Sequence, residues 1–481
     1  MEMIHSRIRL LVWYSLIVIL LSGSAFAAEI RQPAAAGTYY SSIEAELGNQ
    51  IIEFLSNVPE QKSKAKLIAL IVPHAGYDYS GQVAAYAYKE LDGKKFKRVI
   101  LISNSHHQRF DSISVGEYDY YQTPLGRVKV DKEFIDRLVH SSDRISFLRK
   151  AHDQEHSLEV QLPFLQTMLA DEFKIVPIIF GNASFANCQI LAFSLAKLVD
   201  DETLIICSTD WSHYHKYDQA VIMDKLGIEA VLDNDIEKFA DLLTVGSSEA
   251  CGMSAIITTM LLAPSLGANR IKLLNYANLG DVTGDKSRVV GYASIAYVYE
   301  SSPLSATDKE QLLKIARQTL EKHLAGENVP VVEVDPGVLT ERRGVFVTLN
   351  KHGQLRGCIG YIQPVKPLAE AVQAMAIAAA TKDMRFKPVE ADELKDIEIE
   401  ISVLSRLEKV KKTDEIKIGR DGLYIIKGRQ GGLLLPQVAT DNKWDKKEFL
   451  ENVCYKAGLP KNAWKEDSIL YRFSADIFYE D

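Results

Sequence analysis

Apolar runs and helical segments alternate along the first 300 residues of the chain. The strongest runs lie at 67–72, 99–102 and 203–207. Apolar runs of this length, separated by helical segments, are typical of buried strands in a parallel sheet. The pattern predicts an α/β domain over residues 28–301, with a mostly parallel sheet flanked by helices.

The pattern changes after residue 301, where a short polar segment is followed by a new helical period. Residues 307–310 are interpreted as a capping box ahead of an amphipathic helix at 309–323. Downstream, the pattern predicts a hairpin within 344–361, helices at 368–381 and 444–457, and a strand at 397–403. The chain is therefore expected to carry a second, α+β domain over residues 306–481.

The N-terminus has the layout of an export signal. Arg7 and Arg9 precede an apolar run at 10–21, and the segment Ala25-Phe26-Ala27 follows it. This order predicts a signal peptide over residues 1–27 and a periplasmic or secreted mature protein. The alternative is an uncleaved segment that anchors the protein, which is the only membrane contact expected.

The composition excludes some classes of function. The net charge is −8 and no basic face or tail stands out, so no nucleic-acid partner is expected. The chain has five cysteines, and an odd number in an exported protein leaves at least one thiol unpaired. A cysteine that binds a metal would account for one such thiol.

Three histidines follow the three apolar runs, in loops that leave the predicted strands. They are His74, His106 and His213, and Cys251 follows a polar stretch further on. Ligand sites of α/β sheets lie outside the carboxyl ends of the strands, so these side chains are expected to converge. Imidazole and thiolate suit iron, copper or zinc. The alternative is that each histidine is a loop residue bonded only to water or backbone.

The neighbours of these residues leave several roles open. Cys251 is expected in the first turn of a helix at 250–262, where the helix dipole lowers a thiol pKa. Glu249 is the alternative ligand, through its carboxylate. Asp210 either orients His213 or caps its own turn, and His213 is either a ligand or a general base.

Two further segments carry reactive side chains without a standard motif. Residues 152–159 are rich in histidine and acid, and the start of a helix with a structural or pocket-lining role is favoured over direct metal binding. Cys358 lies between Gly357 and Gly360 in a strand pattern, which favours a packing role under the hairpin.

Several strings in the first domain are together specific enough to resemble the Memo family. They are Pro73-His74-Ala75-Gly76-Tyr77, Ser105-His106-His107, Glu155-His156-Ser157, Ser208-Thr209-Asp210 with His213, Cys251-Gly252 and Leu274-Asn275-Tyr276. The resemblance implies a fold like that of class III extradiol dioxygenases. It also implies one iron or copper ion on His74, His106 and Cys251, with His213 as a base beside it and Asp210 as its catalytic neighbour.

The last third of the chain resembles the AMMECR family. The matching strings are Leu355 to Gly360, Met384-Arg385-Phe386, Leu433 to Ala439 and Lys456 to Pro460. The fused pair is similar to the AmmeMemoRadiSam system, which implies a radical SAM partner protein and an unidentified small-molecule or peptide substrate. We expect the second domain to recognise the first domain's substrate or a partner.

Two classes of function stay open at this point. One is a metal-dependent oxidoreductase with dioxygenase-like or reactive-oxygen chemistry. The other is a non-catalytic protein that delivers metal or binds a peptide or a partner protein in its pocket. A cysteine stands where the dioxygenases keep a carboxylate ligand, which argues against ring cleavage.

Overall fold

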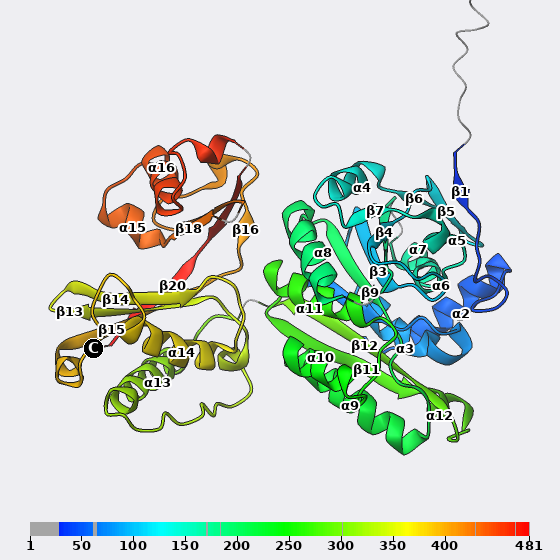
Figure 1. The fold of residues 1–481 in the computed structure, drawn as a ribbon, viewed down its shortest axis with the longest axis horizontal. Helices are drawn as coiled ribbons and strands as arrows, with labels where there is room; N and C mark the ends of the chain where they lie inside the picture. Colours follow the sequence, from blue (N-terminus) through cyan, green and yellow to red (C-terminus); the bar gives the residue numbers. More distant parts are fainter. Residues whose placement is uncertain are drawn as a thin grey trace, which may run out of the picture.

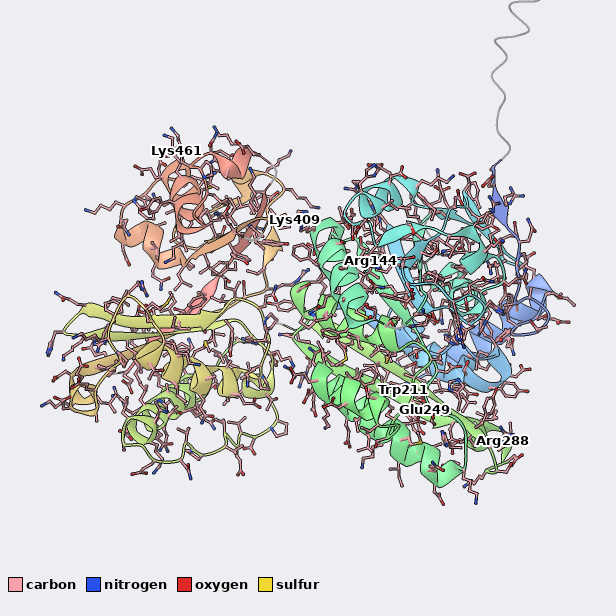
Figure 2. The ribbon with its side chains drawn as sticks, viewed as in Figure 1. Arg144, Trp211, Glu249, Arg288, Lys409 and Lys461 are labelled. Carbon is pink, nitrogen blue, oxygen red and sulfur yellow. The ribbon has the colours of Figure 1, made fainter. Side chains whose placement is uncertain are left out.

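The structure is a computed structural model of the chain. It describes residues 28–60, 65–169, 172–182, 184–300, 302–428, 430–466 and 468–480. The predicted signal peptide at 1–27 lies outside the described residues. Figure 1 shows a front domain, ending at residue 300, beside a second domain that starts at 302. In Figure 2, Lys409 lies at the junction of the two domains and Arg288 on the far side of the front domain.

The front domain is built on one large sheet. Its main path runs through β1 (Ile30–Arg31), β5 (Tyr120–Thr123), β6 (Gly126–Val130), β8 (Lys174–Phe180), β3 (Arg98–Asn104), β9 (Thr203–Ser208), β2 (Lys66–Val72), β12 (Val289–Tyr299) and β10 (His213–His215). At its sides lie β4 (Ile113–Val115), β7 (Ile145–Phe147) and β11 (Arg270–Asn278). The neighbours β6, β8, β3, β9 and β2 are parallel, whereas β12 is antiparallel to β2.

Helices cover both faces of this sheet. They are α2 (Glu44–Ser56), α3 (Tyr77–Lys89), α4 (Lys132–Val139), α5 (Arg149–Asp153), α6 (His156–Glu159), α7 (Leu162–Met168), α8 (Phe185–Leu198), α9 (Tyr217–Leu232), α10 (Ile236–Thr244), α11 (Met253–Ser265) and α12 (Leu279–Thr283). α8 and α11 pack on each other, and α11 also packs on β2, β3 and β9. α2, α3 and α7 form another packed group, in which α3 contacts β2 and β12. The predicted fold class is confirmed.

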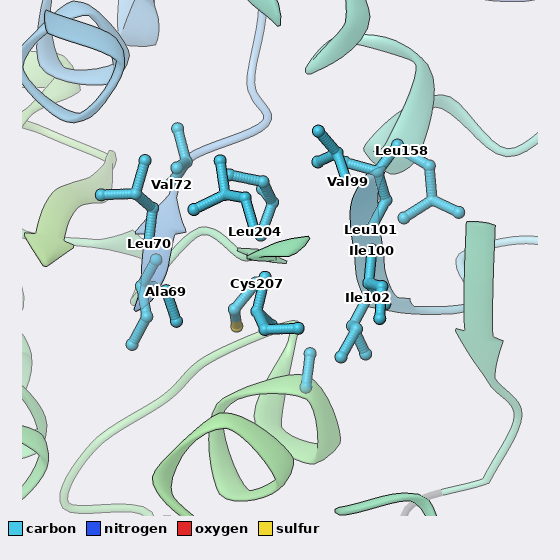
Figure 3. Packing of buried hydrophobic residues seen from close by; sticks show 14 of the residues in the cluster. Ala69, Leu70, Val72, Val99, Ile100, Leu101, Ile102, Leu158, Leu204 and Cys207 are labelled. Carbon is cyan, nitrogen blue, oxygen red and sulfur yellow. The ribbon is translucent and has the colours of Figure 1, made fainter. Parts of the chain in front are cut away.

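The core explains why these strands form where they do. The apolar runs of β2, β3 and β9 are buried, and Figure 3 shows side chains of the three strands, with Leu158 beside those of β3. Parallel strands covered on both faces need a continuous apolar run, because no position faces water. These three strands are neighbours in the order β3-β9-β2, so the loops after them leave the same edge side by side.

A buried ion pair ties the N-terminal strand to this core. The guanidinium of Arg31 is 1% exposed, and its Nη1 donates to Oε2 of Glu159, which is fully buried, at 2.5 Å. Glu159 also accepts hydrogen bonds from the hydroxyl of Tyr40 and from the backbone amides of Ala34 and Ala35. Every lone pair that the carboxylate could offer is therefore used, which compensates for removing the charge from water.

The second domain consists of two four-stranded sheets with separate cores. Spatially, the first sheet contains β14 (Gln354–Tyr361), β13 (Val345–Lys351), β15 (Ile397–Leu404) and β20 (Ala475–Tyr479), and the second β16 (Glu408–Lys409), β19 (Ile469–Phe473), β17 (Gly422–Lys427) and β18 (Gln430–Leu434). The helices are α13 (Ala306–Leu324), α14 (Leu368–Thr381), α15 (Pro436–Asp441), α16 (Lys446–Lys456) and the 3-10 turns Val338–Thr340, Ala391–Asp396, Thr413–Glu415 and Ala463–Lys465. α13 and α14 pack on the first sheet, and α16 packs on the second.

The predicted start of the first helix of the second domain, at residue 309, was wrong by one helical turn. α13 begins at Ala306, and the capping box joins Ser305 to Asp308 rather than using Thr307 and Glu310. Ser305 was interpreted as linker, but its hydroxyl accepts the amide hydrogen of Asp308 while the Asp308 carboxylate accepts that of Ser305. Two overlapping S/T-x-x-D/E patterns were present, and only tertiary contacts select between them.

The second domain docks on the amino ends of the front strands. Arg406 donates from Nε to the carbonyl of Leu266 at 2.9 Å and from Nη2 to Asp201 at 2.8 Å. Gly267, at a φ of +93°, leaves room for Arg406, whose side-chain atoms would lie 2.5–2.8 Å from an added Cβ. The amide of Arg342 donates to the carbonyl of Asn269 at 3.1 Å. This interface lies at the opposite end of the sheet from the strand exits.

Replacing Arg31 by methionine is expected to lower the free energy of unfolding of the front domain by about 3–5 kcal/mol. The reason is that Glu159 would keep its charge in the core without a cation. The measurement is urea unfolding followed by tryptophan fluorescence. The matched control is Arg149→Met, because Arg149 pairs with Glu29 at the surface and an exposed pair contributes less than about 1 kcal/mol. Equal effects of the two variants would contradict the assigned role of the buried pair.

Candidate metal centre

Three histidines and one cysteine meet at the carboxyl edge of the front sheet. His74 follows β2, His106 follows β3, His156 is the first residue of α6, and ligand atoms of the three histidines lie within 4.8 Å of one another. The Sγ of Cys251 lies 3.1 Å from Nε2 of His74. Two atoms bound to one ion at about 2.0–2.3 Å are themselves about 3–4 Å apart, so this spacing fits a shared metal ion.

The ring of His74 is held by a serine hydroxyl whose own hydrogen is already donated to another group. Its Nδ1 lies 2.9 Å from Oγ of Ser208, which donates its own hydrogen to the carbonyl of Ser157 at 2.6 Å. Gln161 donates from Nε2 to the same oxygen at 2.8 Å. Ser208 therefore accepts the hydrogen from Nδ1 of His74, so that Nε2 is the ring nitrogen that faces Cys251.

A buried carboxylate orients His106 in the same way. Glu155 is 1% exposed, and its Oε1 lies 2.8 Å from Nδ1 of His106 while its Oε2 accepts the His106 amide at 2.7 Å. Burial raises the pKa of Glu155, but the hydrogen bonds and charge of His106 hold it well below its usual range. An ionised carboxylate only accepts, so Nδ1 of His106 carries the hydrogen and Nε2 is left for a ligand.

Cys251 does not lie in a helix, as the sequence pattern had predicted. α11 begins at Met253 with Gly252 as its N-cap, and Cys251 precedes both. Its thiol instead accepts the amide hydrogen of Asp210 at 3.1 Å. Burial raises the pKa of Cys251, but the charge of His74 and hydrogen bonds with His106 and His74 lower it to about 6. The imidazoles, rather than the predicted first helical turn, therefore favour the thiolate.

In the absence of a metal ion, His106 and Cys251 shift each other's pKa. Burial alone would lower the pKa of His106, whereas hydrogen bonds with Cys251 and Glu155 raise it to about 10. The pair is thus a thiolate beside an imidazolium at neutral pH. Metal binding releases such protons, since the ligand forms are thiolate and neutral imidazole.

Asp210 holds the turn that carries His74. Its Oδ1 accepts the amide hydrogen of His74 at 2.8 Å, and burial raises its pKa to about 6. Within the described part of the chain, Asp210 makes no hydrogen bond to the ring of His213. Asp210 thus stabilises the turn after β2, which is neither of the two roles that the sequence left open, orienting His213 or capping its own turn.

Glu249 contacts the strand β10 rather than the metal cluster. It accepts the amide hydrogen of His213 at 3.1 Å and lies 2.9 Å from Nε2 of His215. Its carboxylate is therefore engaged with the backbone and ring of residues beside the site. The role of His213 as an acid–base residue stays a prediction.

His156 is the member of the cluster that the sequence analysis assigned a pocket-lining role. Its ring stacks on Tyr39 with centroids 4.3 Å apart and lies 4.8 Å from that of His106. Burial and the neighbouring His74 lower its pKa to about 3, so it is a neutral imidazole. The single helix start predicted at 153–159 is instead the end of α5 and the short α6, which begins at His156. In the sequence, only the string Glu155-His156-Ser157 indicated that His156 belongs to the site.

Comparison with known families identifies both parts of the chain. The family model described as Memo-like protein matches residues 31–296, which is more than half of the sequence. The chain belongs to the Memo-like family. Residues 313–478 match the family model AMMECR1, so the second domain is an AMMECR1 domain.

Individual relatives match only a part of this chain. A MEMO1 family protein of Nitrosopumilus maritimus is 34% identical over 274 residues, covering 56% of this chain and all of that protein. Another from Thermoplasma volcanium is 36% identical over 266 residues, covering 55% and 97%. A protein of Methanothermobacter thermautotrophicus is 49% identical over 188 residues, covering 37% and 98%. The crystal structure of an uncharacterized Pyrococcus horikoshii protein has 41% identity and a TM-score of 0.35, covering 36% and 91%.

One aromatic side chain packs on the cluster of the Memo-like domain, and another follows His213 on β10. Tyr39 covers His156, and Tyr214 is 63% exposed. Tyr214 has a φ of +63°, which is rare for a residue with a large side chain, and the guanidinium of Arg288 lies 5.1 Å from its ring centroid. A strained backbone beside a reactive cluster is typical of functional sites.

Replacing Glu155 by glutamine is expected to weaken the binding of a divalent transition metal by about 10–100-fold. The amide still reaches His106, but it lacks the charge that makes Nε2 a strong donor. A competition titration against a coloured chelator measures the change.

The matched control for this variant is Glu249→Gln. Glu249 also lies beside the site, but it bonds to β10 and to none of the four clustered side chains. The metal affinity of the control is expected to remain within a few-fold of the wild type, roughly as for a surface hydrogen bond. Equal losses in both variants would contradict the role of Glu155.

Proposed function

We propose that the Memo-like domain binds one iron or copper ion per chain through His74, His106 and Cys251. The observation that carries the proposal is the pair of hydrogen-bond networks that engage Nδ1 of both histidines, so that Nε2 is the nitrogen left for a metal ion. His156 is a neutral imidazole within reach as a further donor. Two imidazoles and one thiolate leave coordination positions open for a substrate.

Bound iron or copper would supply redox chemistry, and the function proposed is a metal-dependent oxidoreductase of the dioxygenase-like or reactive-oxygen type. The residues of the chain would bind and orient. Asp210 holds the turn of His74, Glu155 orients His106, and Tyr39 covers one side of the cluster. His213, near Asp210 at the rim, would hold or move a proton of the substrate.

Metal delivery is the second candidate function. The observation that favours it is the exposure of His106, whose side chain is 27% accessible although it belongs to the cluster. A partly exposed ligand allows a partner protein to take up the ion by ligand exchange. Oxygen consumption with turnover supports the oxidoreductase, whereas rapid exchange of the ion with a second chelating protein supports delivery.

We also propose that the chain acts together with a radical SAM protein on a small molecule or peptide. Support comes from the two family assignments within one chain. We place this activity in the periplasm or outside the cell, on the evidence of the N-terminal sequence pattern. Within the described residues, no helix is long and apolar enough to cross a membrane.

Alanine at His74, His106 or Cys251 is expected to reduce the bound iron or copper. The reduction should exceed that caused by the loss of a supporting residue, which lowers metal affinity by about 10–100-fold. Each substitution removes one donor atom. The measurement is metal content by mass spectrometry after purification with and without air, and the wild type should hold one ion per chain.

His213→Ala serves as the contrasting variant in the same experiment. It should keep its metal and lose activity, because the proposed role of His213 is proton transfer. Unchanged metal content in all three ligand variants would reject the proposed centre. Complete loss of metal from His213→Ala would instead make His213 a ligand.

A further inference from the structure

A cavity of about 180 Å³ lies between the two domains. The front domain lines it with Gly267 and Asn269, between α11 and β11, and with Tyr299 at the end of β12. The second domain lines it with residues 342–344, which precede β13, and residues 362–364, which follow β14. Small-molecule sites occur preferentially at such junctions of domains.

The cavity is open to solvent and large enough for a small organic molecule. Pro303, Gln363 and Ser474 belong to its lining and are exposed, so they mark its mouth. A cavity of about 150 Å³ is sufficient to bind benzene in a protein interior. A ligand of similar size can therefore enter this cavity and fit.

Among the described residues of the lining, three are arginines, and two of these are paired with carboxylates. Arg343 donates from Nη2 to Glu341 at 2.6 Å, and Arg406 donates from Nη2 to Asp201 at 2.8 Å. These two positive charges are therefore compensated within the protein.

Arg342 is the third arginine, and its charge has no counterion. Its Nη1 donates to the carbonyl of Val365 at 2.6 Å and its Nη2 to the carbonyl of Asp233, and it forms no ion pair with a carboxylate in the described part of the chain. Burial lowers the pKa of Arg342, and more distant acids offset this effect only in part. A cation that is largely removed from water is costly without an anion beside it.

The lining itself does not supply that anion. Asp476 is the only acid among the lining residues that the structure describes, and its carboxylate pairs with Lys309 at 2.7 Å. After this pair and the two arginine pairs are counted, one positive charge remains. The cavity therefore favours a ligand with a single negative charge.

Free hydrogen-bond donors lie in the same lining. Nη1 of Arg343 and Nη1 of Arg406 donate to no acceptor within the described ranges. The hydroxyl of Tyr299 accepts the amide hydrogen of Arg406 at 3.4 Å, and its own hydrogen has no acceptor among those residues. Guanidinium groups bind carboxylates through two parallel hydrogen bonds, so these donors suit a carboxylate ligand.

The remainder of the lining is largely apolar. It includes Pro264, Ile362, Leu404 and Leu407. An inorganic anion would leave this part of the cavity unfilled, whereas an organic acid would cover it and remove apolar surface from water.

We propose that this cavity is a binding site for a small organic monocarboxylic acid. The carboxylate lies against Arg342, and the organic part lies against the apolar side chains. Because both domains line the cavity, the ligand bridges them. The site does not depend on the proposed metal centre, which lies at the opposite end of the front sheet.

Isothermal titration calorimetry of the full chain with benzoate tests the proposal. Benzamide is the neutral comparison of the same shape, and inorganic phosphate is an anion without an apolar part. Benzoate is expected to bind at one site per chain. Benzamide should bind at least about tenfold more weakly, because a hydrogen bond to a charged group contributes more than one to a neutral group. Phosphate binding as tight as that of benzoate would overturn the assignment to an organic acid.

Substitutions in the lining locate the site. Arg342→Met removes the unpaired cation and is expected to weaken benzoate binding by about tenfold or more. Gln363 is exposed, so its substitution leaves the core intact. Gln363→Glu should weaken benzoate binding by about two- to fivefold, and Gln363→Lys should strengthen it by a similar factor, because the new charge repels or attracts the carboxylate. Thermal unfolding checks each fold; if Arg342→Met is unfolded, the two Gln363 variants decide.

The matched controls are Gln354→Glu and Gln354→Lys. Gln354 is also exposed, but it is the first residue of β14, whereas Gln363 follows the last. The eight residues of this strand separate the two positions by about 25 Å at 3.3 Å per residue. This exceeds the screening length of about 8 Å at physiological salt, so both controls should bind benzoate as the wild type does.

Three results would each overturn the proposal: no binding of benzoate, equal binding of benzamide, or a benzoate affinity that the Gln363 variants change no more than the Gln354 controls do. The metal content of the front domain is measured on the same samples. It should be unchanged in all these variants, so failure of this site and failure of the metal centre are distinguishable.

Discussion

The parallel pairing of β3, β9 and β2 is the constraint on which the rest of the front domain depends. Parallel neighbours end at the same edge, so the loops that carry His74, His106 and Asp210 leave the sheet side by side. Complete burial of these strands keeps that edge rigid. The strand exits therefore supply a fixed frame, and segments that are distant in sequence, such as those of His156 and Cys251, are added to it.

Polar contacts behind the cluster determine which atoms of the histidines face the site. Ser208 accepts a hydrogen bond from Nδ1 of His74, and Glu155 accepts one from Nδ1 of His106. Both rings therefore present Nε2 to the site. Arg31 extends this support, because it donates to the carbonyls of His152 and Glu155 as well as to Glu159. The N-terminal strand, far from the site in sequence, thus holds the segment that orients His106. The geometry is arranged before any ion binds, which lowers the cost of binding.

The second domain contacts the front domain at the end of the sheet opposite to the metal cluster. Arg406 and Arg342 contact the amino ends of the front strands and the loops beside them, whereas the metal cluster lies at the carboxyl ends. The seven residues of β2 separate the two ends by about 20 Å at 3.3 Å per residue. That the second domain recognises the substrate of the front site or a partner protein stays a prediction.

Local sequence determined the elements, because strand burial and helix periodicity act over neighbouring residues. The strands after which His74 and His106 lie, the helix Leu368–Thr381 and the hairpin ending at Tyr361 were all predictable from apolar patterns. Tertiary structure alone decided that His156 joins the cluster, that Cys251 precedes its helix, and that Glu155 rather than Asp210 orients a ligand ring. Those outcomes depend on hydrogen bonds between residues 49–177 positions apart or on how short segments break against the core, and no local pattern encodes such contacts.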